Sequence, residues 1–128
     1  MSLLAAIEYI EKIGGYDAIK NAEKPLIEAM LAGFEKLADR VQLIGPKTSE
    51  NRIGVFSFII PGKHPTDIAD ALAEKNICVR AGFHCAEPLS QTIDPDSADR
   101  IPSVRASIYF YNDLREVERF FEALEQII

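Results

Sequence analysis

The sequence predicts an α+β domain in which a small, mostly antiparallel sheet has helices packed on one face. Its segments alternate between helical and strand-like periodicity in the order helix, helix, strand, strand, helix, strand, strand, helix. The chain has 128 residues and 48% apolar residues, which is enough to bury the core of one ordinary domain spanning residues 1–128.

Two helices are predicted before residue 40. Apolar residues recur at helical spacing from Leu3 to Ile13, and Gly14-Gly15 breaks the pattern. A second helical stripe runs from Ile19 to Ala38. Pro25 lies inside this stripe, so either the helix kinks there, or it begins near Lys24 with the proline in its first turn.

The middle of the chain predicts two strands and a helix. Val41–Ile44 and Ile53–Ile60 are rich in β-branched and aromatic residues, and Pro61-Gly62 turns the chain after them. Pro65 to Lys75 has helical spacing, and Asn76 suits the left-handed conformation that ends many helices.

Two further strands and a helix follow. Ile77–Ala81 and Val104–Phe110 alternate like strands with one apolar face, and residues 90–102 between them are polar and rich in helix breakers, which predicts a mobile loop. A final helix opens after Asp113, which is spaced from Glu116 as in a capping box.

Charge and composition exclude several classes of partner. The net charge of −6 and the lack of a basic cluster argue against nucleic acid and anionic membranes. No apolar run approaches the roughly 20 residues that span a bilayer, and no signal-peptide pattern is present. Two cysteines make no disulfide framework, which favours a reducing cytoplasm.

The candidate site is the stretch that follows the strand at Ile77–Ala81. Gly82 can turn the chain there, and His84 and Cys85 stand side by side just after it. A thiol close to a histidine and to Arg80 can be held partly as the nucleophilic thiolate. The alternative is a small buried cysteine on a structural loop.

Two arginines and the second cysteine complete the candidates. Arg80 and Arg105 both alternate with apolar residues, so we expect them on the sheet face opposite the helices. There they would meet an anion or another domain, unless they form ordinary surface salt bridges. Cys78 is expected to be buried and inert, whereas Cys85 is expected to be accessible.

Two motifs resemble the cysteine desulfurase and selenocysteine lyase family, which are class-V aminotransferase relatives. The stretch Arg80-Ala-Gly-Phe-His-Cys-Ala-Glu-Pro-Leu89 is similar to that family's active-site pattern Arg-x-Gly-His-His-Cys-Ala-x-Pro-Leu. Val104-Arg-Ala-Ser107 and Tyr111-Asn112 resemble its Arg-Ala-Ser strand and Tyr-Asn turn. The order of elements is similar to the family's C-terminal small domain, so the resemblance covers nearly the whole chain.

The resemblance implies a pyridoxal-phosphate enzyme that removes sulfur or selenium from cysteine or selenocysteine. Cys85 would hold the sulfur as a persulfide, and His84 beside it would take part in proton transfer. Arg105 would pair with the substrate carboxylate, and Arg80 would support the substrate or the loop. A homo-oligomer and a sulfur-acceptor protein are also implied.

The chain departs from the family pattern in three ways. Phe83 replaces the first histidine, and the loop Gln91 to Arg100 looks longer than the family's link, with twenty positions from Cys85 to Arg105. No segment resembles the large domain with its Schiff-base lysine. We therefore expect the C-terminal part of such an enzyme, studied as a fragment or encoded separately. It should bind no pyridoxal phosphate and catalyse no desulfuration by itself.

Three alternatives come from other functional classes. A cofactor-free sulfur-carrier or interaction module would use Cys85 alone. A metal site would use Cys78, His84, Cys85 and His64, although these residues lack the paired spacing of zinc ligands. A ferredoxin-like regulatory domain fits the order of elements but has no ligand motif.

Overall fold

The computed structural model describes residues 2–91, 93 and 100–128. Its helices are α1 (Ser2–Lys12), α2 (Gly15–Lys36), α3 (Pro65–Glu74), α4 (Glu87–Ser90) and α5 (Leu114–Glu125). Its strands are β1 (Gln42–Ile44), β2 (Val55–Ile59), β3 (Arg80–Gly82) and β4 (Ser103–Ser107). Among the described residues, no helix is both long and apolar enough to cross a membrane.

The strands form one antiparallel sheet in the order β1-β2-β4-β3. The two inner strands pair Phe56 with Ala106 and Phe58 with Val104, and all four side chains are buried. On β4 the residues that alternate with these, Arg105 and Ser107, therefore lie on the opposite face of the sheet.

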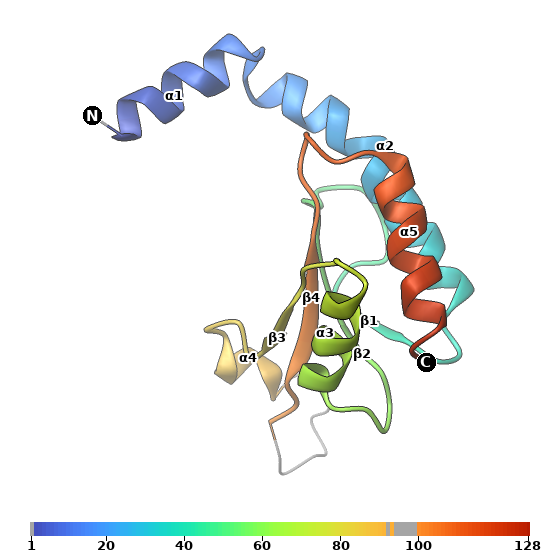
Figure 1. The fold of residues 1–128 in the computed structure, drawn as a ribbon. Coiled ribbons are helices and arrows are strands. Elements are labelled where there is room, and N and C mark those ends of the chain that lie inside the picture. Colours follow the sequence, from blue (N-terminus) through green and yellow to red (C-terminus); the bar gives the residue numbers. More distant parts are fainter. Residues whose placement is uncertain (1, 92, 94–99) are drawn as a thin grey trace.

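The core lies between the sheet and helices α2, α3 and α5, which all pack on the same face (Figure 1). Phe34 of α2 is central to it, with ring centroids 6.0 Å from Phe56, 5.2 Å from Phe58 and 6.2 Å from Phe120. The predicted fold class, an antiparallel sheet with helices on one face, is confirmed.

Helix α1 projects away from this core (Figure 1). Its apolar side chains have large exposed fractions: 73% for Leu3, 61% for Leu4 and 46% for Ile7. The first part of the stripe that predicts this helix, from Leu3 to Ile7, is therefore not covered by the rest of the described chain, whereas Ile10 and Ile13 are half-buried.

The second and last helices agree well with the sequence. The helix does not begin near Lys24: it is continuous from Gly15 through Pro25 to Lys36. It changes direction along its length, which agrees with the alternative of a kinked helix (Figure 1). The predicted capping box is confirmed: the Asp113 carboxylate accepts from the Glu116 N–H at 3.0 Å, and the Glu116 carboxylate accepts from the Asp113 N–H at 3.1 Å.

The predicted strand Ile77–Ala81 is wrong in its first part, because β3 begins only at Arg80. Asn76 has a positive φ of 58°, and the Ile77 N–H donates to the Leu72 carbonyl at 3.0 Å. The residues directly after α3 therefore form the C-terminal cap of that helix, and pairing with the sheet begins only at Arg80. The strand predicted at Val104–Phe110 likewise ends at Ser107, followed by a turn in which the Tyr109 N–H donates to the Asn112 side chain at 2.8 Å.

Candidate functional site

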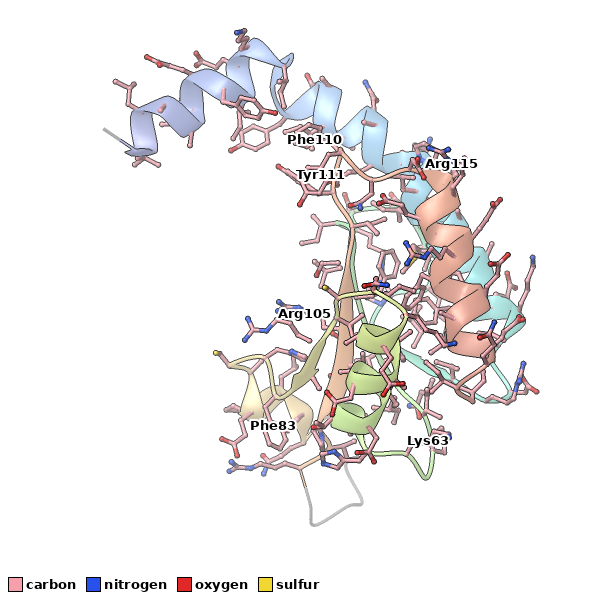
Figure 2. The ribbon with its side chains drawn as sticks, viewed as in Figure 1. Lys63, Phe83, Arg105, Phe110, Tyr111 and Arg115 are labelled. Atoms are coloured by element: carbon pink, nitrogen blue, oxygen red, sulfur yellow. The ribbon has the colours of Figure 1, made fainter. Side chains whose placement is uncertain are left out.

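Arg80 and Arg105 lie directly opposite each other in the β3–β4 register. Both are on the sheet face away from the helices, and Figure 2 shows Arg105 pointing from β4 toward that side. Within the described residues neither arginine forms an ion pair. Like charges placed opposite each other across two strands repel, so this pair predicts an anion between or above them.

Arg105 carries the clearest sign of a missing partner. Its side chain is half-buried, and its Nε atom is buried without a hydrogen-bond partner. A buried guanidinium N–H that donates to nothing is costly, and a carboxylate or phosphate oxygen would satisfy it. The expectation that Arg80 and Arg105 share the open face is confirmed, whereas their role in binding stays a prediction.

The loop after β3 holds His84 and Cys85 in an uncommon conformation. Gly82 has φ +117°, and His84 and Cys85 follow with φ +54° and +60°. The Ala86 N–H donates to the Phe83 carbonyl at 2.8 Å, which closes a tight turn around the two residues. Two successive non-glycine residues in the left-handed region cost about 1–2 kcal/mol each, and such strain concentrates at functional sites.

The turn presents the Cys85 thiol to solvent. Cys85 is exposed, and α4 begins two residues later at Glu87. Glu87 forms an ion pair with Arg100, which fastens α4 to the segment that leads into β4. The prediction of an accessible Cys85 is confirmed, and the alternative of a buried structural cysteine is wrong.

His84 is fixed by Ser103, a contact that the sequence did not reveal. The His84 Nε2 lies 3.1 Å from the Ser103 carbonyl oxygen and 3.1 Å from its Oγ. Burial lowers the pKa of His84, Arg105 and Arg80 lower it further, and the hydrogen bond that the ring donates to the Ser103 carbonyl acts in the opposite direction. The net lowering of the pKa favours the neutral form of the ring. The one signal for this contact is Ser103 itself, a polar residue two positions before Arg105 and so on the same strand face.

Cys78 contradicts the prediction that it would be buried. It is exposed, as Cys85 is. The error follows from the strand boundary, because Cys78 lies before β3 and receives no cover from a neighbouring strand. Exposure alone therefore does not distinguish the two thiols, and their surroundings must.

The remaining candidates form no second site in the described part of the chain. No group of three or more histidine, cysteine and acidic side chains gathers there in a way that could hold a metal, so the metal alternative lacks a ligand set. His64 lies at the start of α3, where its Nδ1 accepts from the Thr66 N–H at 3.3 Å. Of the loop predicted at residues 90–102, residues 92 and 94–99 lie outside the described part of the chain.

Comparison with known proteins decides the family. The family model described as Aminotransferase class-V matches residues 1–120. The chain belongs to this family. It is 38% identical over 128 residues to a protein from Pyrococcus abyssi named "Probable cysteine desulfurase", and 34% identical to a protein of the same name from Staphylococcus aureus (strain COL). The alignments cover 100% and 98% of this chain, but only 30% and 29% of those relatives.

Solved structures of cysteine desulfurases have a similar fold. The apo cysteine desulfurase from Thermococcus onnurineus NA1 matches with a TM-score of 0.85 and 37% identity, over 97% of this chain and 29% of that one. The cysteine desulfurase CsdA (S-sulfonic acid) from Escherichia coli matches with a TM-score of 0.74 and 25% identity, over 95% of this chain and 28% of that one. The chain therefore spans somewhat under a third of the proteins it resembles.

Proposed function

We propose that this chain is the C-terminal small domain of a pyridoxal-phosphate-dependent cysteine desulfurase or selenocysteine lyase. The supporting observation is the cross-strand pair of Arg80 and Arg105, which precedes a strained turn that exposes Cys85. The Nε of Arg105 is buried and has no partner among the described residues. The relatives named as cysteine desulfurases make this the family activity to test first.

Arg105 binds the substrate carboxylate in this proposal. Its free Nε–H and the planar guanidinium fork suit a bidentate pair with two carboxylate oxygens. Arg80, directly opposite, adds a second positive charge to the same face. An amino acid held in this way has its side chain directed to a fixed place, which is what attack by a thiol requires.

Cys85 receives the sulfur. Its thiolate attacks the substrate sulfur, a new S–S bond forms, and the substrate C–S bond breaks with its electron pair left on carbon. That carbon then takes a proton, so that alanine leaves and Cys85 remains as a persulfide. Neutral His84, next to Cys85, accepts the proton that the thiol must lose before it can attack.

Pyridoxal phosphate supplies the electron sink for such a cleavage when it is bound in a complete enzyme. The four strands of the sheet carry no lysine that could form a Schiff base and no carboxylate that could face a pyridine nitrogen. We propose that the rest of the enzyme holds it, and that a sulfur-acceptor protein and a second copy of the enzyme are the further partners.

A chimera tests the proposal. The matching segment of the Thermococcus onnurineus enzyme is replaced by this chain, and alanine and persulfide formation from L-cysteine are measured with pyridoxal phosphate present. We expect activity in the chimera and its loss in Cys85→Ala. Cys78→Ala is the matched control, because Cys78 is also exposed but lies outside the turn.

Mass spectrometry of the sulfurated chimera locates the sulfur. The proposal is contradicted if Cys85→Ala retains activity, or if the persulfide is found on Cys78. Persulfide that forms on the isolated chain from a cofactor-free sulfur donor, and passes to acceptors without the other domain, would instead favour the sulfur-carrier module.

A further inference from the structure

Ser103 is buried, with an exposed fraction of 5%, and it contacts His84 through two oxygens. Its place at the start of β4, opposite Gly82 of β3, brings it next to the turn that carries His84. Gly82 has no side chain, so nothing on β3 lies between Ser103 and the imidazole at that register position.

The two contacts determine which ring nitrogen carries the proton. A carbonyl oxygen can only accept a hydrogen bond, so the Nε2 that lies 3.1 Å from the Ser103 carbonyl must donate. The Ser103 Oγ, also 3.1 Å from Nε2, then accepts a share of the same N–H. In a neutral imidazole this leaves Nδ1 without a proton, as an acceptor.

Nδ1 is the unused atom of the ring. It is buried and has no hydrogen-bond partner among the described residues. Arg105 on β4 and Arg80 on β3 are the cations that act on the ring, and both disfavour a second proton there. On the adjoining helix α4, Glu87 is paired with Arg100.

We propose that Ser103 is a positioning residue that holds His84 as the Nε2–H tautomer, which leaves Nδ1 unprotonated in the turn that carries Cys85. The acceptor role of Nδ1 toward the thiol rests on the proposed function. The tautomer itself does not, since it follows from the contacts with Ser103.

The tautomer is measured directly in the ¹⁵N-labelled 128-residue chain by long-range ¹H–¹⁵N correlation at pH 7.5. His64→Gln assigns the signals, because the chain has only two histidines. We expect His84 to show a protonated Nε2 and an unprotonated Nδ1. In Ser103→Ala the loss of one acceptor should move the tautomer ratio about fivefold toward Nδ1–H. Ser103→Thr keeps the hydroxyl and should keep the native ratio.

Several results would overturn the positioning role. These are a native His84 in the Nδ1–H form, an imidazolium at pH 7.5, or an unchanged ratio in Ser103→Ala whose circular dichroism is native. If Ser103→Ala does not fold, the Thr variant carries the test, because a ratio unlike the native one would refute the role of the hydroxyl.

The acceptor role is tested separately in a Cys78→Ala background by the pH profile of Cys85 alkylation. We expect Ser103→Ala and His84→Gln to shift the midpoint in the same direction, with no further shift when they are combined. A changed tautomer with an unchanged alkylation profile would leave Ser103 as the positioning residue and refute proton acceptance by His84. The tautomer and alkylation measurements use the 128-residue chain, so an inactive chimera would contradict the proposed function without changing either result.

Discussion

Replacing Arg80 with glutamine should stabilise this chain, although it removes a positive charge from a protein of net charge −6. Arg80 and Arg105 are register partners on one face, and neither forms an ion pair within the described residues. The mutual repulsion of the two guanidinium groups is therefore present in the folded state and absent from the unfolded chain.

The size of the effect follows from the strand geometry. Facing side chains on paired strands have Cβ atoms about 5 Å apart, and long side chains diverge further. Two unit charges about 7 Å apart in water repel by about 0.6 kcal/mol. We therefore expect Arg80→Gln to raise the free energy of unfolding by about 0.5 kcal/mol at low ionic strength.

Urea denaturation at low salt and in about 1 M NaCl checks this value. In about 1 M NaCl the Debye length is about 3 Å, so the gain in stability from Arg80→Gln should vanish. Lys63→Gln is the matched control: Lys63 is exposed on the turn before α3, and its loss only makes the net charge more negative. If Arg80→Gln destabilises the chain as Lys63→Gln does, the two arginines do not repel, and the case for an anion site on this face fails.

Three further outcomes are expected. The pKa of His84 is lower in the folded chain than in the unfolded chain, so the unfolded chain binds more protons. The free energy of unfolding should therefore fall as the pH drops from about 6.5 to the lower folded-state pKa. In His84→Gln the urea midpoint should no longer depend on pH in this window. Relief of the left-handed strain at Cys85, about 1–2 kcal/mol, exceeds the entropic cost of glycine, about 0.4–1 kcal/mol, so Cys85→Gly should be more stable than Cys85→Ala in thermal denaturation by about 0.5–1 kcal/mol. The exposed α1 stripe should make the chain self-associate in sedimentation, and Ile7→Lys should weaken this.

Each of these outcomes has a control or a refuting result. His64→Gln should retain the pH slope that His84→Gln removes. Equal stability of the glycine and alanine variants at position 85 would mean that the turn is not strained. A strictly monomeric native chain at high concentration would show that the α1 stripe does not associate.

Much of the fold could be predicted because local signals and tertiary structure agree. The stripe of α5 and its capping residues Asp113 and Glu116 are local, and the structure has both. The failure at residues 77–79 is also local in origin: Asn76 does end the helix, as its residue type predicts, but the Ile77 N–H is used in that same termination.

The finer structure of the site could not be predicted. The motif and the alternation indicate Cys85, Arg80 and Arg105, but not the left-handed conformation of Cys85, because glycine and asparagine signal that conformation in a sequence and cysteine does not. The contact between His84 and Ser103 depends on the β3–β4 register, which is a tertiary property. The exposure of Cys78 depends on where the neighbouring strand begins, which periodicity does not reveal.

The β3–β4 register also changes how the long link between Cys85 and Arg105 should be understood. Arg105 faces Arg80 because Val104 and Ala106 on either side of it are buried in the core, and a slip by one residue would turn Arg105 into the core. Apolar burial therefore sets the position of the guanidinium, and the number of residues in the link does not. Insertions and deletions between residues 91 and 100 should accordingly leave the spacing of the site groups unchanged, and family members with links of different length can share one arrangement of cysteine and arginine.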